Sequence, residues 1–370
     1  MPETPETPET AGDPETPDNP GTPETPETTA LVNHCFRLAN RPVGLPKRGD
    51  WTYGAEPVRA PGEGELLVKV LYLSLDPAMR GWMNEARSYV PPVGIGEVMR
   101  AFGAGRVVSS RHPGFAAGDQ VTGAFGMQEY AVANGKGVTR IDPALGPPAP
   151  LPVYLGVLGI PGMTAYFGLL DTGQAKAGDT VVVSAAAGAV GMVVGQIAKI
   201  KGCRAVGIAG GPEKCRYLLD ELGFDAAIDY KAGGVEEMKE ALRRHCPRGV
   251  DVYFDNVGGD VLDAVLTRLA RGARVVICGA ISQYNRTDPP KGPSNYMALL
   301  VQRASMKGML VFDYADRYAE AGREMAGWMA AGKLKSREDV VAGLETFPET
   351  LLKLFRGENL GKLVLEVARA

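Results

Sequence analysis

A row of small residues at 185–191, AAAGAVG, has the composition of a loop that binds phosphate. It follows the apolar run TVVVS and precedes GMVVGQIAKIKG, which has a helical pattern. Backbone N–H groups at a helix N-terminus lack partners and the helix dipole is positive there, so an anion is favoured. Gly188 would let a pyrophosphate approach the backbone, and Gly191 would let helix and strand pack tightly. Ala186 replaces the first glycine of the GxGxxG pattern, so the turn alone could also serve packing only.

The elements around this turn favour the phosphate interpretation. From about residue 155, apolar runs rich in Val and Ile alternate with amphipathic segments. Strands are predicted at 180–187, 203–210, 226–230, 250–258, 273–280 and 304–312. Helices are predicted at 190–202, 212–223, 234–246 and 260–272. Such runs between helices are typical of parallel strands covered on both faces, so we predict a doubly wound α/β domain that binds a dinucleotide.

The next turn indicates which dinucleotide. A free ribose 2′-hydroxyl usually meets an acid at the end of the second strand, but Gly210 and Gly211 stand there. Lys214 and Arg216 follow within one helical turn. Glu213 is the only acid beside them, and it is placed to cap the helix. Since cations replace the acid, we predict a 2′-phosphate and hence NADP(H) rather than NAD(H); the alternative for Lys214 is an ordinary surface lysine.

The regions that flank this predicted domain have a different residue pattern. Short strands separated by Gly and Pro, such as ELLVKVLYLSLD and AGRVVSS, predict a compact, barrel-like β domain before residue 150. The C-terminal segment from RYAEAG to GKLVLEVA reads as a helix, a loop, a second helix and a strand that return to this domain. Residues 1–30 contain an imperfect P-E-T repeat without apolar side chains after Met1. We expect an extended, disordered tail, either solubilising or involved in docking or proteolysis.

Composition excludes several classes. Residues 1–28 hold eight acidic and no basic side chains, which leaves a mildly basic remainder within a formal net charge of −3. That balance suits a small anionic ligand and predicts no nucleic-acid surface. No apolar stretch reaches the roughly 20 residues of a membrane span, and no signal peptide is visible. The five scattered cysteines form no ligand spacing, so we expect reduced thiols and a cytoplasmic protein.

Segments in both predicted domains carry a family resemblance. NRPVG, LYLSLDPAMRG, GIPGMTAYFGLL, AAAGAVG, YFDNVGG, ICGAISQYN and ENLGKLV occur in this order. Together they resemble the zinc-free medium-chain dehydrogenase/reductases, in particular the prostaglandin/leukotriene reductases, alkenal reductases and bacterial curcumin reductase. The resemblance implies a GroES-like catalytic domain from 31–150 and 312–370, with a Rossmann cofactor-binding domain at 151–311. Relatives are commonly homodimers joined through the edge of the Rossmann domain.

The resemblance also implies roles for individual residues. The pyrophosphate would be held by Ala186, Ala187, Gly188, Ala189, Val190 and Gly191. The 2′-phosphate end of the cofactor would be contacted by Gly211, Lys214 and Tyr230. The nicotinamide half would be lined by Asn256, Cys278, Gly279 and Ala280, and Asn359 of the C-terminal segment would reach the cofactor. Tyr284 would lie at the substrate pocket. Two residues depart from the pattern: Met192 replaces a common serine, and Ala78 replaces a common tyrosine on the substrate side.

Zinc chemistry is not expected. Zinc dehydrogenases carry a Gly-His-Glu signature where this chain reads GIGEVMRAFGAGRVV, and no cysteine cluster follows. His34 and His112 are expected at the surface. Asp76 and Arg80 are interpreted as a local ion pair rather than as catalytic groups.

Conjugate reduction needs no metal, because it requires only positioned partners and a donor to the carbonyl oxygen. We therefore predict NADPH-dependent reduction of the C=C bond of α,β-unsaturated ketones and aldehydes. Tyr284 is the candidate donor, or else a buried tyrosine that only packs. The alternatives are a quinone reductase of the same fold and a cofactor-binding protein without turnover.

Overall fold

The computed structural model describes residues 31–141, 149–289 and 292–368, and the P-E-T tail lies outside these ranges. The strands are β1 (Val32–Leu38), β2 (Trp51–Pro57), β3 (Leu66–Ser74), β4 (Gly103–Ser110), β5 (Gln120–Gly123), β6 (Tyr130–Ala133), β7 (Thr139–Arg140), β8 (Thr180–Ser184), β9 (Arg204–Ala209), β10 (Ala226–Asp229), β11 (Val250–Asp255), β12 (Leu269–Ile277), β13 (Ser305–Gly308), β14 (Glu338–Ala342) and β15 (Lys362–Glu366). The helices are α1 (Ala78–Trp82), α2 (Ile160–Phe167), α3 (Gly191–Ile200), α4 (Pro212–Arg216), α5 (Val235–His245), α6 (Gly259–Leu266), α7 (Met297–Gln302), α8 (Tyr318–Ala330) and α9 (Phe347–Arg356).

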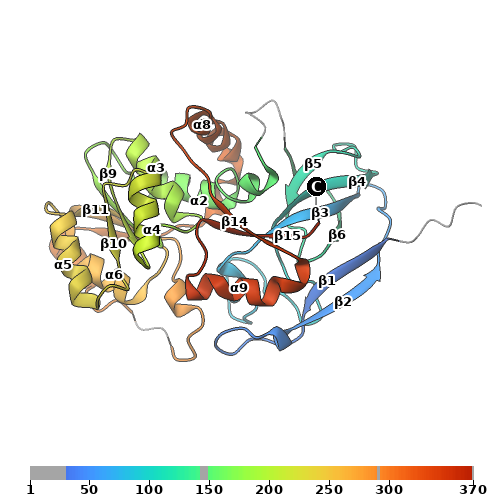
Figure 1. The fold of residues 1–370 in the computed structure, drawn as a ribbon, viewed down its shortest axis with the longest axis horizontal. Coiled ribbons are helices and arrows are strands. Elements are labelled where there is room, and N and C mark those ends of the chain that lie inside the picture. The colour runs from blue at the N-terminus through green and yellow to red at the C-terminus, as the bar shows by residue number, and fades with distance from the viewer. Residues whose placement is uncertain (1–30, 142–148, 290–291, 369–370) are drawn as a thin grey trace, which may run out of the picture. The chain divides into compact units, whose positions relative to one another are not determined.

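The sheet formed by β8 to β13 is parallel throughout, in the order β10-β9-β8-β11-β12-β13. This is the strand order of a doubly wound dinucleotide-binding fold. Successive side chains of β8 point to opposite faces, as the two-residue period of a strand requires. Val181 and Val183 pack with Val194 and Ile197 of α3, whereas Val182 packs in the cluster of α5 and α6. Figure 1 shows α3 and the α5–α6 pair on different sides of these strands.

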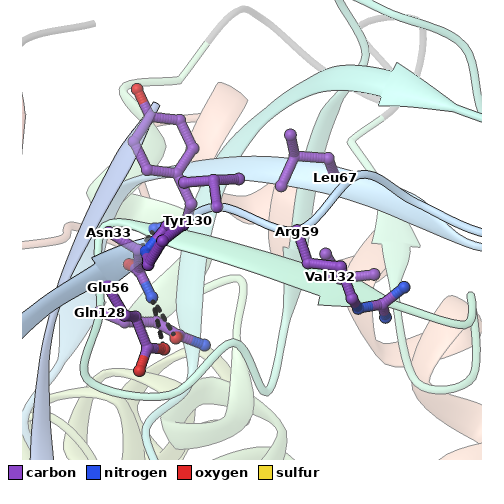
Figure 2. A pocket seen from close by; sticks show the side chains of 9 residues that line it. Asn33, Glu56, Arg59, Leu67, Gln128, Tyr130 and Val132 are labelled. Atoms are coloured by element: carbon purple, nitrogen blue, oxygen red, sulfur yellow. Dashed lines mark hydrogen bonds between the residues drawn. The ribbon is translucent and has the colours of Figure 1, made fainter. Parts of the chain in front are cut away.

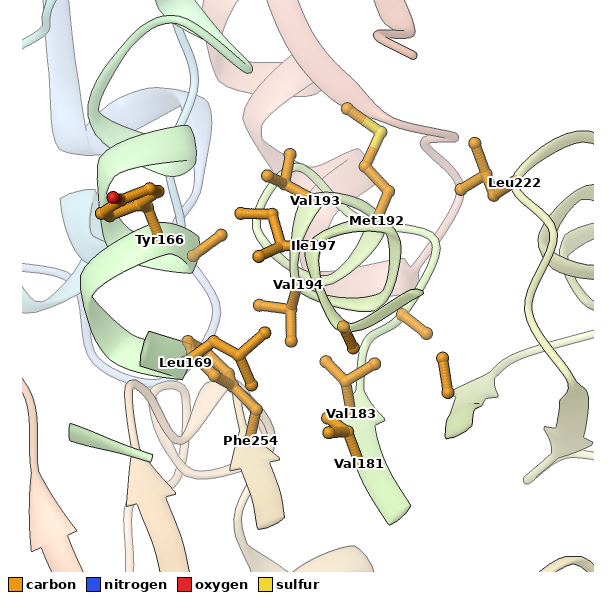
Figure 3. Close-up of a cluster of buried hydrophobic side chains, with 14 of the residues drawn as sticks. Tyr166, Leu169, Val181, Val183, Met192, Val193, Val194, Ile197, Leu222 and Phe254 are labelled. Carbon is orange, nitrogen blue, oxygen red and sulfur yellow. The ribbon is translucent and has the colours of Figure 1, made fainter. Parts of the chain in front are cut away.

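Figure 3 shows the larger of these clusters in detail. Side chains from β8, α3 and the segment after α2 meet there, and all of those labelled are buried. Phe254 of β11 closes the cluster toward the middle of the sheet. Gly195 lies in α3. A Cβ added there would stand 1.8 Å from the ring of Phe224, so this contact requires glycine. Burial of this kind is the main stabilising contribution to such a core.

The N-terminal part is β-rich, as predicted. Its larger sheet runs in the order β14-β15-β3-β4-β5-β7, with β6 paired to β3, and β1 and β2 form a separate two-stranded sheet. The C-terminal segment therefore contributes two strands to a sheet that begins near residue 66. The fold class of a β-rich part beside a doubly wound Rossmann-like part is confirmed. The domain boundaries at residues 150 and 312 stay a prediction.

Some element predictions were wrong in extent. The helix predicted at 260–272 ends at Leu266, because Leu269 pairs with Val250 and begins β12. The strand predicted at 304–312 ends at Gly308, and a 3-10 turn begins at Val311. The loop predicted before the last helix contains β14, which pairs in parallel with β15. In the first and third of these cases, strand pairing with a partner elsewhere in the sequence overrides the local pattern.

Candidate functional site

A cavity of about 950 Å³ lies at the C-terminal ends of the parallel strands. Its wall includes Ala185 after β8, Gly210 after β9 and Cys278 after β12. Residues 75–78 of the β-rich part and the segment before β15 complete the wall. Ligands of open parallel sheets bind at this edge, where the strands end.

The small-residue turn forms one wall of the cavity. Ala185 has a φ of 49°, so the chain turns sharply directly after β8. A Cβ added at Gly191 would lie 2.4 Å from the carbonyl oxygen of Ala185, which makes this glycine necessary for the close approach of α3. Among the described residues, the amide groups of Ala189, Val190 and Gly191 have no hydrogen-bond acceptor. The turn thus offers free N–H donors at a helix N-terminus, as a phosphate requires.

Two ammonium groups gather where α4 and β10 meet the C-terminal segment. Lys214 Nζ donates to the carbonyl oxygen of Gly357 at 2.8 Å. Burial lowers the pKa of Lys214, and the nearby charge of Lys231 lowers it further. In the part of the chain that the structure describes, no carboxylate lies within 4.0 Å of either ammonium. A phosphate dianion would compensate both charges, so this donor set fits an anionic ligand.

Asp229 holds the turns that carry these lysines. Its Oδ1 accepts hydrogen bonds from the backbone N–H groups of Gly211 at 2.8 Å and Lys231 at 2.9 Å. The carboxylate at the end of β10 therefore serves the backbone rather than a ribose hydroxyl. Tyr230 lines the cavity beside them and is 43% exposed.

The opposite end of the cavity is built on β11 and β12. Asn256 donates from its side-chain amide to the carbonyl oxygen of Ser184 at 2.8 Å. Asp255 is 1% exposed and accepts from Ser184 Oγ and from the hydroxyl of Tyr253, which fixes the start of this loop. Burial raises the pKa of Cys278 to about 12, with a smaller contribution from Asp255. Cys278 is therefore a neutral thiol at physiological pH, and it lines the cavity as a small apolar side chain.

Tyr284 presents a hydroxyl to the same end. Its oxygen accepts a hydrogen bond from the backbone N–H of Ala280 at 3.1 Å. Burial raises its pKa, so the hydroxyl keeps its proton. Since the oxygen is the acceptor in this bond and the hydroxyl donates to no group among the described residues, the phenolic proton can point toward a ligand oxygen.

The C-terminal segment touches the turn directly. The N–H of Gly361 donates to the carbonyl oxygen of Ala187 at 2.8 Å. Asn359 is 8% exposed, and its side-chain amide donates to the carbonyl oxygen of Gly361. Lys362 follows, with its Nζ 2.9 Å from Asp76 Oδ1. These residues connect the turn to the β-rich part of the molecule.

An apolar region extends from Tyr284. The rings of Trp82 and Phe102 lie 6.3 Å apart between centroids, and Phe312 lies 6.3 Å from Phe102. Ala78 lines this region without a polar group, as its sequence departure predicted. Such a lining would seat the hydrophobic body of a small ligand.

Most of the predicted site residues line this one cavity. Those that do are Ala187, Gly188, Ala189, Val190, Gly191, Lys214, Tyr230, Asn256, Cys278, Gly279, Tyr284 and Asn359. Ala186, Gly211 and Ala280 do not line it. Ala186 is fully buried beneath the turn, while Gly211 and Ala280 act through the N–H bonds to Asp229 and Tyr284. Their assignment to cofactor binding stays a prediction.

One sequence expectation needs correction. Asp76 pairs with Lys362, whereas Arg80 bonds to the carbonyl oxygens of Pro42 and Gly44, so the predicted local ion pair is wrong. A lysine 286 residues away supplies the closer partner because β15 lies beside β3. Met192 is fully buried away from the cavity, where the hydroxyl of Tyr217 contacts its sulfur. Arg216 does not line the cavity.

Lys231 was missed by the sequence analysis. Its signal was its position directly after Tyr230, but only the packing of the β10 turn against Gly210 brings its side chain beside Gly210 and its charge near Lys214. A Cβ added at Gly210 would lie 3.0 Å from Lys231 Cε.

A second, much smaller hollow of about 120 Å³ lies between β2 and β6. Figure 2 shows the amide of Asn33 directed at Gln128 and Glu56 there, and these bonds already satisfy the polar atoms. Over the ranges that the structure covers, no three His, Cys, Asp or Glu side chains are grouped to hold a metal. No helix within these ranges is both long and apolar enough to span a bilayer.

Comparisons with known proteins extend over both parts of the chain. A family model described as the N-terminal domain of oxidoreductase matches residues 34–141, and one described as zinc-binding dehydrogenase matches residues 189–327. The NADPH-dependent curcumin reductase of Escherichia coli (strain K12) is 45% identical over 342 residues, covering 91% of this chain and 97% of that protein. The NADP(+)-dependent 2-alkenal reductase of Nicotiana tabacum is 40% identical over 336 residues, covering 90% and 96%. The crystal structure of CurA in complex with NADPH from Vibrio vulnificus superposes with a TM-score of 0.85 at 46% identity, covering 91% of this chain and 100% of that one.

Proposed function

Because the chain belongs to the medium-chain dehydrogenase/reductase family and is an NADPH-dependent oxidoreductase, we propose that it reduces the C=C bond of α,β-unsaturated ketones and aldehydes. The observation that carries this proposal is the Tyr284 hydroxyl, whose oxygen already accepts the N–H of Ala280. This hydroxyl is a ready hydrogen-bond donor at the apolar end of a cavity whose other end fits phosphates. The names of the relatives support the substrate class.

The proposed chemistry divides among a few groups. Bound NADPH supplies a hydride to the β-carbon of the substrate, which places negative charge on the carbonyl oxygen. Tyr284 donates a hydrogen bond to that oxygen, where the interaction strengthens as charge develops. The apolar rings around it exclude bulk water and strengthen this bond. Water supplies the proton that completes reduction at the α-carbon.

The cofactor contacts follow from the same geometry. We propose that the free amides of the 185–191 turn hold the pyrophosphate, with Lys214 and Tyr230 at the 2′-phosphate. Asn256, Cys278, Gly279 and Asn359 would line the nicotinamide half. Gly211 and Ala280 would contribute through backbone positions, and Ala186 by supporting the turn. The support for this assignment is that the free donors lie at one end and the neutral side chains at the other.

The test compares Tyr284→Phe with the wild-type enzyme. We expect NADPH consumption with a long-chain 2-alkenal to give the saturated aldehyde, and the variant to lose about tenfold to a hundredfold in kcat. Affinity for NADPH should be unchanged. Tyr53→Phe is the matched control, because Tyr53 is 44% exposed on β2 and outside the cavity. A wild-type enzyme that reduces quinones but not enals would overturn the substrate class, whereas full turnover by Tyr284→Phe would leave Tyr284 a packing residue.

We also propose a cytoplasmic homodimer. β13 is the edge strand of the parallel sheet, and α7 beside it exposes Leu300 (70%) and Val301 (60%). An open edge with apolar neighbours favours pairing with a second copy. Light scattering on Leu300→Glu should give a monomer if this edge is the interface, and an unchanged dimer would exclude it.

A further inference from the structure

The cavity contains one charged pair that the proposed chemistry does not use. Lys362 is 1% exposed, and its ammonium donates to Asp76 Oδ1 at 2.9 Å and to the carbonyl oxygen of Leu75 at 2.7 Å. The other carboxylate oxygen of Asp76 accepts from Ser74 Oγ. Both members of the pair line the cavity.

This pair joins two walls of the cavity. Asp76 begins the segment at 75–78 that lines the apolar end near Ala78. Lys362 follows Gly361, whose N–H bonds to Ala187 in the phosphate-binding turn. The backbone hydrogen bonds between these two segments end here, with the N–H of Leu75 donating to the carbonyl oxygen of Leu363 at 3.2 Å. The ammonium therefore fixes the substrate-side segment to the chain that also contacts the turn.

Because the ion pair is buried, its role is to position neighbouring groups rather than to stabilise the fold. A buried ion pair adds little net stability, because desolvation offsets most of the attraction, but its directed bonds restrict the positions of its neighbours. Hydride transfer is sensitive to such restriction, since a misplacement of about 1 Å can cost a hundredfold in rate. The segments that the pair connects belong to two different walls of the cavity.

We propose that Lys362 and Asp76 are positioning residues that set the distance between the substrate wall and the cofactor wall. The inference rests on the proposed function for its kinetic readout. Neither side chain takes part in proton or hydride transfer. Their contribution is expressed in the hydride-transfer step, through Leu75 and Ala78 on one side and Gly361 on the other.

The test uses the double variant Asp76→Asn with Lys362→Met, which removes both charges and so leaves no unpaired ion in the interior. We expect kcat with a 2-alkenal to fall about tenfold to a hundredfold while the affinity for NADPH, measured by fluorescence titration, changes little. The deuterium isotope effect with 4-deuterated NADPH should rise, because hydride transfer becomes the slow step. Amide exchange should accelerate at residues 74–78 and 359–363, with the rest of the chain unchanged.

The matched control neutralises another ion pair of the β-rich part, Arg59→Met with Glu65→Gln. This pair is 2.7 Å apart and lies outside the cavity, so we expect wild-type kinetics and an unchanged isotope effect. Should the first double variant fail to bind NADPH, Asp76→Asn alone weakens the tether but keeps an amide oxygen that can accept from the buried Lys362 ammonium, and it is expected to show the same changes at smaller amplitude.

Wild-type kcat and isotope effect in a folded, NADPH-binding Asp76→Asn/Lys362→Met enzyme would overturn the inference. The same wild-type values in Asp76→Asn would overturn it if the double variant does not fold or does not bind NADPH. Absence of enal reduction by the wild-type enzyme would instead refute the proposed function, and faster amide exchange at the two segments would then still test the tether.

Discussion

Lys214 lines the cavity, and the charge of Lys231 acts on it from the turn after β10. Burial lowers the pKa of Lys214, and the nearby positive charge of Lys231 lowers it further. A doubly charged phosphate relieves this repulsion, whereas a ribose hydroxyl does not. Discrimination between NADPH and NADH should therefore depend on both lysines.

The first prediction separates the two lysines from Arg216. Lys231→Ala and Lys214→Ala should each weaken binding of 2′,5′-ADP by about tenfold, the loss of roughly one charged hydrogen bond. Binding of 5′-AMP should hardly change, since it lacks the 2′-phosphate. Arg216→Ala is the control, because Arg216 lies on the same helix as Lys214 but neither lines the cavity nor is among the charges that shift the pKa of Lys214. Isothermal titration calorimetry measures all these affinities, and equal losses for both nucleotides would exclude a role in 2′-phosphate recognition.

At the scale of elements, the start of α3 is positioned by contacts that leave no room for side chains. Gly191 packs against the backbone of Ala185, at 2.4 Å from an added Cβ. Gly188 is less crowded, because its added Cβ would meet the same carbonyl oxygen at 3.2 Å. Gly188 lines the cavity as well, so a methyl group there would face the ligand. The two glycines of one turn thus serve different purposes.

The second prediction follows from this difference. Gly191→Ala should destabilise the protein by about 1–3 kcal/mol, as overpacking against a backbone group does. Gly188→Ala should unfold near the wild-type temperature but bind NADPH more weakly. Thermal unfolding without ligand and a fluorescence titration with NADPH measure the two effects. A reversed result, with Gly188→Ala the less stable variant, would contradict the assigned contacts.

At the scale of the whole molecule, the thiols share one property although they lie in different elements. None of the five forms a disulfide, and burial raises the pKa of each. The pKa rises to about 11 for Cys203 and Cys246 and to about 12 for Cys278. The folded protein therefore keeps protons that the unfolded chain releases near pH 9.

The third prediction is a loss of stability at alkaline pH. Above the unfolded thiol pKa, the unfolded state binds fewer protons than the folded state, so the free energy of unfolding falls as pH rises. The fall begins near pH 9 and continues through the folded pKa values near 11 and 12. Urea midpoints across this range measure it, and Cys203→Ala with Cys246→Ala should flatten the slope. An unchanged slope in that variant would assign the effect to other groups.

The sequence by itself determined the features whose causes are local. Valine-rich runs between amphipathic helices were sufficient for the doubly wound part, because strand and helix periods are properties of short segments. The 185–191 turn was identifiable for the same reason, since its small residues, the preceding strand and the following helix are contiguous. Replacement of an acid by Gly210 and Gly211 was likewise readable, and it pointed to NADPH.

Only the tertiary structure decided which distant residues meet. Asp76 has Arg80 four residues away, yet it pairs with Lys362 because β15 lies beside β3. Lys231 rather than Arg216 joins Lys214, because the β10 turn folds over Gly210. Contacts of this kind depend on how whole elements pack, and local periodicity carries no information about the partner of a strand edge or the depth of a side chain.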